Sequence, residues 1–353
     1  MPMKWWGWGE EGRSFSLAAP EQFWSFVGKR LGGSGVSPRL DSPQQIVLRP
    51  CRLSAEHLAA LRRSIGDPYV SVDTVERAVH SLGKGYRDLV RMRRGEITEP
   101  TDAVVYPHTE EAVAAVLEAA AERGFAVVPF GGGTSVVGGV EPVAGSAAIA
   151  LDLSRMDRVL QVDRVSATAT VEAGILGPAL EAQLNAAGFT LGHFPQSFEY
   201  SSLGGWIATR SAGQNSTLYG KIEERVESTR ILFPGGALTT NAVPAAAAGP
   251  DFNQVIAGSE GVLGVITQAT VRVTPLPERT DYRGYLIPSF EAGVEAAREM
   301  LQAGLRPSVL RLSDEPESEA TAIMSVGAEG MNAALLILGF DGAEDEVSCC
   351  WER

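Results

Sequence analysis

The sequence predicts an α+β protein with a helical N-terminal region, a central mixed domain and an incomplete α/β unit after it. Three observations lead to this prediction. The chain has 353 residues, a length typical of two or three domains. Helix and strand patterns alternate along its central part, where a buried-looking strand runs into a glycine-dense loop. We expect the domains at residues 1–98, 99–278 and 279–353.

The N-terminal region is expected to be irregular at first and helical afterwards. Residues 32–43 are rich in Gly, Ser and Pro, which is typical of a linker or surface loop. Ser54 is the expected cap of one helix, because serine accepts hydrogen bonds from the first free amides of a helix. A second helix is expected over Thr74–Tyr86.

The central domain is expected to start with a short strand, AVVYP, directly after Asp102. Thr109 caps a predicted helix over Glu110–Arg123, which has two glutamates in its first turn and Gly124 just past its end. Alternation, β-branching and turn residues then predict the strands Phe125–Phe130, Ala147–Leu153, Val159–Asp163 and Ala167–Glu172, a helix from Pro178 to Gly188, and a strand pair, Gly264–Gln268 and Thr270–Thr274.

The last part of the chain is expected to start a second α/β unit. It has a strand at Tyr282–Ile287, a helix at Ser289–Ala303, and strands at Ser308–Leu312 and Ala333–Phe340. No final helix is expected after the last strand, and a β-α-β-β unit without one covers its sheet poorly. We therefore expect an unfinished domain.

The most informative loop lies within Phe125–Glu141, which reads FAVVPFGGGTSVVGGVE. The glycines at 131–133 have no Cβ atom, so the backbone can take positive φ and bring its N–H groups together around a ligand. Such a concave row of amides binds anions, and the expected anion is a pyrophosphate. A P-loop is excluded because residues 139–140 are Gly-Val, and a dinucleotide fingerprint is excluded because Val136 replaces its third glycine. The alternative is a tight turn between strands.

Two further segments have the same character. Residues 194–216, FPQSFEYSSLGGWIATRSAGQNS, combine small residues, hydroxyl groups and paired glycines with little apolar periodicity. Such a segment can lay amides and hydroxyl groups along a flat, polar ligand such as a flavin or its ribityl chain. Residues 258–267, GSEGVLGVIT, form a third glycine turn that runs directly into a strand. Each segment alone is a weak signal, but the three in this order within one domain match a known pattern.

Composition and charge limit the function. The net charge of −13 argues against a general nucleic-acid binder. The basic stretch Arg52–Arg94 favours a solvated helix face, and the alternative is a site for an anionic substrate or membrane surface. The three cysteines have no metal-ligand spacing, so no metal site is expected, and they suit a reducing cytosol. No apolar run is long enough to span a membrane.

The chain resembles the vanillyl-alcohol-oxidase type of FAD-binding flavoproteins, whose FAD-binding domain is of the PCMH type. Within that superfamily it is most similar to the alkyldihydroxyacetonephosphate synthases (alkylglycerone-phosphate synthases). The segments that carry the resemblance are KWWGWG at 4–9, PFGGGTSVVGG at 129–139, QSFEYSSLGGWIATRSAG at 196–213, LYGKIEERV at 218–226, GSEGVLGVIT at 258–267 and RPSVLRLSD at 306–314. FAD-linked 2-hydroxyacid dehydrogenases share the glycine turns, whereas KWWGWG, EYSSLGGWIATRSAG and RLSD favour the synthases.

The resemblance implies a definite reaction. These synthases exchange the acyl chain of acyl-dihydroxyacetone phosphate for a long-chain alcohol, forming the ether bond of ether lipids without net redox change. The flavin acts as the nucleophile, so that one hard displacement becomes two easier ones. The alternative enzyme is an FAD-linked oxidase or dehydrogenase of a 2-hydroxy acid.

The resemblance also implies the residues of the site. Arg311 matches the family arginine near the flavin in the substrate site, and its permanently charged guanidinium suits a phosphate or a developing oxyanion. From the residues alone, Arg311 is a surface arginine at a strand end. The implied FAD contacts are Pro129, Phe130, Gly131, Gly132, Gly133, Thr134, Ser135, Gln196, Ser197, Phe198, Glu199, Tyr200, Ser201, Ser202, Thr209, Arg210, Ser211, Ala212, Glu260, Gly261, Val262, Leu263, Gly264, Val265 and Ile266.

The FAD is expected to be bound non-covalently. Relatives with covalent FAD often carry a histidine in the first glycine loop, and Thr134 stands at that position here. His193 could lie near the flavin, but a single histidine at a loop edge is more often structural.

The family continues past the point that matches residue 353, so a C-terminally truncated chain is expected. The missing part completes the cap domain and carries a His-rich run and a tyrosine assigned to acid–base work. A third hypothesis is therefore an inactive, truncated flavin-binding fragment. The expected partner is a lipid or other small-molecule substrate, not nucleic acid, and a homodimer is left open. The expected location is the cytoplasm; the tryptophans of KWWGWG favour packing against the protein, with a peripheral membrane contact as the alternative.

Overall fold

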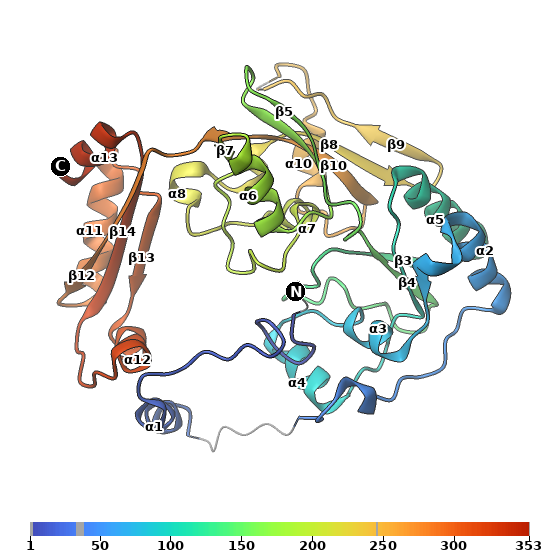
Figure 1. Ribbon diagram of the computed structural model, residues 1–353, viewed down its shortest axis with the longest axis horizontal. Coiled ribbons are helices and arrows are strands. Elements are labelled where there is room, and N and C mark those ends of the chain that lie inside the picture. Colours follow the sequence, from blue (N-terminus) through green and yellow to red (C-terminus); the bar gives the residue numbers. More distant parts are fainter. Residues whose placement is uncertain (1–2, 33–38, 245, 353) are drawn as a thin grey trace.

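The computed structural model describes residues 3–32, 39–244 and 246–352. It confirms an α+β architecture in which two sheets form the body of the molecule and a third stands apart (Figure 1). Six of the residues in the predicted surface loop 32–43, namely 33–38, lie outside the described residues. No helix among the described residues is long and apolar enough to cross a membrane.

The N-terminal region is helical, as predicted, but with one more break. Ser54 caps α2 (Ala55–Ile65) through a hydrogen bond from the His57 amide. The predicted helix Thr74–Tyr86 is wrong, because the segment holds two helices, α3 (Thr74–Val79) and α4 (Tyr86–Arg94). The break lies where Gly83 packs so closely on the glycine loop that a Cβ atom would stand 2.1 Å from the Ser135 carbonyl oxygen. The other elements of this region are α1 (Pro20–Leu31) and the short helices η1 (Pro43–Gln45) and η2 (Asp67–Tyr69).

The first sheet has the order β1-β2-β4-β3 and carries the predicted glycine loop at the end of β3. Its strands are β1 (Val70–Ser71), β2 (Ala103–Val105), β4 (Ala148–Asp152) and β3 (Ala126–Phe130), the last three parallel to one another. The helix α5 (Glu110–Arg123) begins after its Thr109 cap and ends at Gly124, whose φ is 72°, as the sequence predicts. Every residue of β4 is buried, so this strand lies at the centre of the core.

The second sheet is antiparallel, with the order β5-β6-β10-β8-β9. Its strands are β5 (Val159–Asp163), β6 (Thr168–Glu172), β10 (Val265–Arg272), β8 (Val226–Phe233) and β9 (Gly236–Thr239). The predicted strand pair around residue 269 is wrong, because β10 is one strand with register shifts against β8 and no turn residue interrupts it. Its core contains Val171, Val271 and Leu180 of the adjacent helix α6 (Gly177–Ala186).

Short elements connect this sheet to the site and to the third sheet. They are β7 (Phe189–Thr190), which pairs with β11 (Thr274–Pro275), and the helices α7 (Leu203–Ala208), α8 (Ser216–Tyr219), α9 (Ile222–Arg225) and α10 (Phe252–Ile256).

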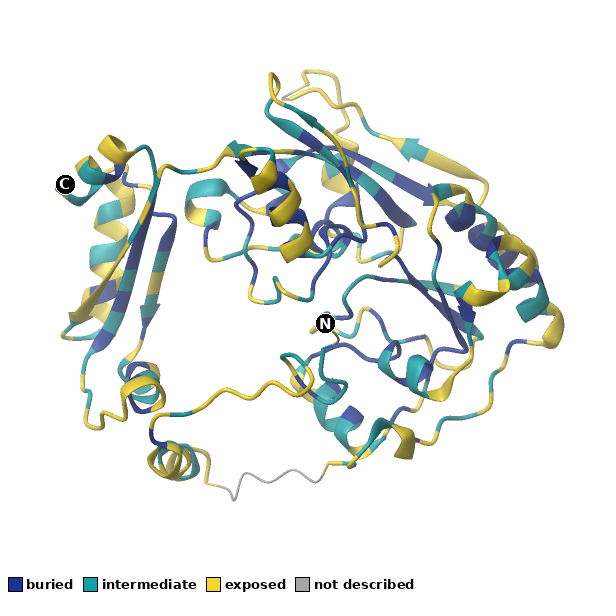
Figure 2. Cartoon of the chain, viewed as in Figure 1, coloured by how far each residue is buried: buried dark blue, intermediate teal, exposed yellow. Residues whose placement is uncertain are grey.

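The third sheet belongs to the C-terminal unit and has the order β12-β14-β13. The strands are β12 (Arg279–Ile287), β14 (Ala334–Gly342) and β13 (Val309–Ser313), and the helices are α11 (Phe290–Gln302), α12 (Glu315–Val326) and α13 (Glu344–Glu352). The expectation that no helix follows the last strand is wrong. In α13, Trp351 packs edge-on against Phe340 at 4.7 Å between ring centroids. Figure 2 shows β12 largely exposed, with burial concentrated in the two body sheets.

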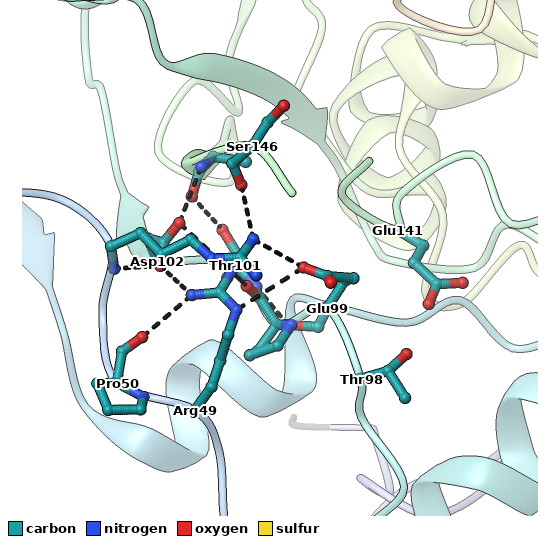
Figure 3. Close-up of polar contacts among 12 residues, drawn as sticks. Arg49, Pro50, Thr98, Glu99, Thr101, Asp102, Glu141 and Ser146 are labelled. Carbon is teal, nitrogen blue, oxygen red and sulfur yellow. Dashed lines mark hydrogen bonds and ion pairs between the residues drawn. The ribbon is translucent and has the colours of Figure 1, made fainter. Parts of the chain in front are cut away.

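A buried polar network ties the N-terminal region to the first sheet (Figure 3). The Asp102 carboxylate, fully buried, accepts hydrogen bonds from Arg49 Nη1 at 2.6 Å, from the Arg52 amide at 2.8 Å and from the Ala148 amide at 2.9 Å. Arg52 Nη1 also donates to Glu99 at 2.9 Å. Burial works to raise the pKa of Asp102, but the hydrogen bonds from Arg49 and the two amides outweigh it and hold the pKa below its usual range.

Candidate functional site

The three glycine-containing segments meet around one cavity of about 1020 Å³, between the two body sheets. The loop after β3 forms one wall, and the segments before and after α7 form another. The turn that leads into β10 completes it, together with Trp8 and Phe15 from the N-terminal segment. A cavity of this size lies at the upper end of the range for small-molecule and cofactor sites.

Most of the sequence-predicted cofactor residues line this cavity. They are Pro129, Phe130, Gly131, Gly132, Gly133, Thr134, Ser135, Gln196, Ser197, Glu199, Tyr200, Ser201, Ser202, Thr209, Arg210, Ser211, Ala212, Glu260, Gly261, Gly264 and Ile266. The structure thus brings together residues from three segments that are far apart in the chain.

Five predicted residues do not line it. Phe198 packs inward, with its ring nearly parallel to that of Trp206, and Val265 belongs to the buried core. Val262 and Leu263 point to solvent, with Val262 84% exposed. Arg311 lies on β13 of the C-terminal unit and forms a 2.8 Å ion pair with Glu317.

The glycine loop must be glycine because it is pressed against the segment before α7. A Cβ atom on Gly132 would lie 1.5 Å from the Tyr200 carbonyl oxygen, and one on Gly131 would lie 2.2 Å from Ser202 Oγ. Gly133 has φ of 65°, which side chains rarely allow. The close approach of two backbones, and not only chain reversal, therefore explains these residues.

The backbone amides of this loop indicate an anion-binding site. Within the described part of the chain, none of the amides of Gly131 to Gly138 donates a hydrogen bond to the protein. Residues 131–135 of this row are buried or half-buried and line the cavity. Backbone amides away from water are nearly always paired, so their consecutive free amides form an anion-binding arrangement. The residues present therefore fit the diphosphate of FAD.

Two strained residues face the same cavity. Arg210 and Glu260 have φ of 50° and 52°, a conformation uncommon for residues with a side chain. Arg210 holds its place by donating to the carbonyl oxygens of Ala257 and Gln254. Burial raises the pKa of the Glu260 carboxyl. Such outliers persist only where the surrounding structure imposes them, and they cluster at binding sites.

His193 lies beside the site but does not line it. Its ring is 1% exposed, Nε2 lies 3.1 Å from Ser211 Oγ, and Nδ1 has no hydrogen-bond partner among the described residues. Burial lowers the pKa of His193 to about 4, with smaller contributions from Glu223, which raises it, and Arg225, which lowers it. The imidazole is therefore neutral at physiological pH.

Sequence reasoning missed several lining residues. Trp8 and Phe15 line the cavity, although the tryptophan cluster was interpreted only as packing or as a membrane anchor. No sequence signal identifies them, because only the fold brings this irregular N-terminal segment against the cavity. Val136, Val137 and Trp206 also line it. Among the described residues, no group of three His, Cys, Asp or Glu side chains could hold a metal ion.

Comparison with known proteins gives the same assignment. A family model for the FAD binding domain matches residues 101–241, and one for the C-terminal domain of FAD linked oxidases matches residues 276–349. The alkyldihydroxyacetonephosphate synthase of Trypanosoma brucei brucei is 37% identical over 313 residues, which are 82% of this chain and 51% of that protein. The synthase of Dictyostelium discoideum is 39% identical over 248 residues, 70% of this chain and 41% of that protein. The chain thus spans about half the length of the curated relatives it matches.

A solved structure of an alkyldihydroxyacetonephosphate synthase superposes on nearly the whole chain. The TM-score is 0.88 at 30% identity, and the match covers 99% of this chain and 72% of that one. The mitochondrial D-lactate dehydrogenase (cytochrome) of Arabidopsis thaliana is 30% identical over 308 residues, 86% of this chain and 52% of that protein. The FAD binding domain implies FAD as the cofactor. The chain belongs to the FAD-binding, PCMH-type oxidase family, together with the alkyldihydroxyacetonephosphate synthases it resembles.

Proposed function

We propose that this chain is a flavoprotein of the alkyldihydroxyacetonephosphate synthase type. The single observation that carries the proposal is the structural match to a solved synthase over 99% of the chain. In the proposed reaction, acyl-dihydroxyacetone phosphate loses its acyl group as a fatty acid, and a fatty alcohol supplies the oxygen of the new ether bond. No net oxidation occurs. FAD, when bound, supplies the nucleophile for this exchange.

The residues of the cavity would act by binding and orienting the cofactor. The free amides of Gly131 to Gly138 would hold the diphosphate, since they have no partner within the described protein. The hydroxyl group of Ser202 lies on the wall formed by the segment before α7 and can donate to a ribityl chain or ring, whereas Ser197 Oγ already donates to Ser201 Oγ and can only accept. Arg311 stays the proposed phosphate or oxyanion contact. It shares one face of its sheet with Asp341, which accepts a hydrogen bond from Tyr219 of the body.

We propose that the FAD is held without a covalent bond. Thr134 cannot form the link that a histidine forms in some relatives. No histidine or cysteine is among the described residues that line the cavity, which supports the same proposal.

A cytoplasmic chain that touches a membrane peripherally is part of this proposal, because the substrate is a lipid. Helix α1 supports it: none of its residues is buried, Trp24 and Leu31 are 62% and 79% exposed, and Lys29 and Arg30 lie in its last turn. Exposed aromatic and basic residues on one helix suit an anionic lipid surface. The test is co-sedimentation with phosphatidylserine vesicles, which Trp24→Ala should weaken. Equal co-sedimentation of Trp24→Ala and wild type would contradict the proposed membrane contact.

A second candidate is an FAD-linked dehydrogenase of a 2-hydroxy acid, which the similarity to D-lactate dehydrogenase favours. The response of the bound flavin to substrate separates the two, once the presence and type of flavin binding have been checked. After purification, acid precipitation should release flavin into the supernatant if it is bound non-covalently. In a separate sample of native protein, anaerobic addition of D-lactate should bleach the flavin absorbance if the chain is a dehydrogenase. A synthase should instead convert acyl-dihydroxyacetone phosphate and hexadecanol into the ether product without bleaching.

A further inference from the structure

The N-terminal strap, defined as residues Met3 to Phe15, walls the cofactor region on two sides. Trp8, Gly9 and Phe15 line the main cavity. Met3, Trp5 and Glu11 line a second cavity of about 540 Å³, and Gly132 and Gly133 of the glycine loop form part of that same wall. The loop is therefore enclosed between the main cavity and a space that the strap closes. The family model for the FAD binding domain starts at residue 101 and does not include the strap.

Lys84 connects the strap to the glycine loop through two different groups. Its backbone amide donates to the Ser135 carbonyl oxygen at 2.7 Å. Its ammonium group donates to the carbonyl oxygens of Lys4 at 3.0 Å and of Trp5 at 3.3 Å. A Cβ atom on Gly85 would lie 2.9 Å from the Val136 carbonyl oxygen, so this turn is in close contact with the loop. One residue thus fixes both the strap and the loop.

The charge of Lys84 has no carboxylate partner. The side chain is 9% exposed, and no described Asp or Glu lies within ion-pair distance of it. Burial lowers the pKa of Lys84 to about 8. A buried cation without a counter-ion is costly, which is the arrangement expected where a bound anion later supplies the balance. The charged or titratable groups around it are Lys4, Glu11, Asp41, His80, Asp88 and Arg93.

We propose that Lys84 is a positioning residue of the FAD site, which holds the glycine loop and the strap together and places a positive charge behind the diphosphate-binding amides. The proposal rests on FAD binding, and it holds whichever reaction the flavoprotein catalyses. An anion bound at the loop favours the charged form of Lys84. Protonation of Lys84 and binding of FAD therefore strengthen each other.

The first test is FAD affinity at pH 7, measured by quenching of flavin fluorescence for wild type, Lys84→Met and the control Lys29→Met. Met keeps the length of the side chain and removes its charge. Lys29 is an exposed lysine on α1 that lines neither of the two cavities. We expect Lys84→Met to bind FAD about tenfold or more weakly, since charged hydrogen bonds are the stronger ones, and Lys29→Met to match wild type. An affinity of Lys84→Met within twofold of wild type would overturn the proposal.

Hydrogen exchange of the FAD-free proteins tests the role of Lys84 separately from the proposed function of the chain. Lys84→Met should exchange faster in residues 3–15 and 131–138 and unchanged in β4. This readout needs no flavin, so it still decides the role of Lys84 if wild type fails to bind FAD, which would overturn the proposed function instead. Equal exchange rates in the strap of Lys84→Met and wild type would contradict the proposal.

The pH dependence of FAD affinity in the wild-type protein gives a third test, which can be made even if Lys84→Met does not fold. FAD affinity should fall as the pH rises through about 8, because the ammonium group loses its proton. The stability contribution of Lys84 has the opposite sign. Its pKa is lower in the folded state than in the unfolded chain, so this group makes the FAD-free fold more stable as the pH rises above 8. A purely structural role predicts only the second effect. Equal FAD affinity at pH 7 and pH 9 would overturn the proposal.

Discussion

The network around Asp102 and the glycine loop are both polar and both enclosed by the first sheet, but they differ in where their hydrogen bonds go. Asp102 is fully buried, and every hydrogen bond it accepts comes from the protein itself, from Arg49, Arg52 and Ala148 (Figure 3). The amides of Gly131 to Gly138 have no acceptor among the described residues, and residues 131–137 line a cavity. One region is complete in itself, and the other needs a ligand.

This difference separates stability from binding. Removing one partner from a complete buried network leaves the other charges unpaired, and the cost appears in the free energy of unfolding. Reshaping a loop with free amides changes the fit of an anion, and the cost appears in the dissociation constant. Substitutions in the two regions should therefore affect different measurements.

Gly132→Ala should have the largest effect on FAD binding. The new Cβ atom would lie 1.5 Å from the Tyr200 carbonyl oxygen, so the two backbones must separate and the row of amides must move. We expect FAD to bind at least about 100-fold more weakly, and the free energy of unfolding to fall by about 1–3 kcal/mol through overpacking. Flavin fluorescence and thermal unfolding measure the two effects.

Gly284→Ala is the matched control for that substitution. Gly284 has ordinary backbone angles, and its added Cβ atom would meet only a Leu335 methyl group at 3.9 Å. FAD affinity should stay at the wild-type value. If Gly132→Ala also keeps that value, the loop does not hold the diphosphate.

Asp102→Asn should reduce stability without changing FAD affinity. The amide cannot accept all the hydrogen bonds that the carboxylate accepts, and it leaves Arg49 with only its longer, 3.7 Å ion pair to Glu99. We expect a loss of about 3 kcal/mol in the free energy of unfolding. Denaturant unfolding at pH 7 measures it, and FAD titration at 20 °C provides the second readout. A large loss of FAD affinity in a folded variant would contradict the separation between the two regions.

The pH dependence of the same substitution has a defined sign. The pKa of Asp102 is lower in the folded state than in the unfolded chain, so its contribution is present above the unfolded pKa and is lost as the pH falls through the folded one. The difference in stability between wild type and Asp102→Asn should therefore shrink below about pH 4.

His193 should have a smaller effect on the free energy of unfolding, and in a different pH range. Its pKa is about 4 in the folded state, against 6.5 for an unperturbed histidine, so the unfolded chain binds a proton between these values. The fold should lose on the order of 2–3 kcal/mol as the pH falls from 6.5 to 4. His193→Gln retains a polar group near Ser211 and should flatten that part of the stability curve. Equal slopes for both proteins would show that His193 is not buried in its neutral form.

The sequence predicted those parts of the fold that depend on local signals. The caps Ser54 and Thr109 and the helix end at Gly124 are correct, because each acts on hydrogen bonds within its own helix turn. The break between α3 and α4 could not be predicted from its own residues. It is fixed by contact of Gly83 with Ser135, which lies far away in the sequence. Helix α13 was missed although its acidic first turn is a helix-start signal, because nine residues with a single buried one give no clear apolar period.

The candidate site divides in the same way. The glycine loops were visible in the sequence because glycine marks close backbone approach. The contribution of Trp8 and Phe15 was not, since only the fold brings the strap against the glycine loop. Phe198 and Val265 lie within the predicted segments yet face the core. Adjacent residues of a strand such as β10 point to opposite faces, and residues of an irregular segment follow no fixed period, so a segment match alone cannot assign each side chain.

Arg311→Leu should have the smallest effect on both stability and FAD binding. Its ion pair with Glu317 joins side chains that are 47% and 50% exposed, and such pairs contribute about 0.5 kcal/mol or less. It does not line the main cavity, so FAD affinity should match wild type. If the proposed function is correct, the variant should still lose turnover of acyl-dihydroxyacetone phosphate, and Arg311→Lys should recover only part of it, because lysine lacks the planar fork that binds phosphate. A fall in FAD affinity would instead show that Arg311 contacts the cofactor. The C-terminal unit would then bind the same ligand as the glycine loop.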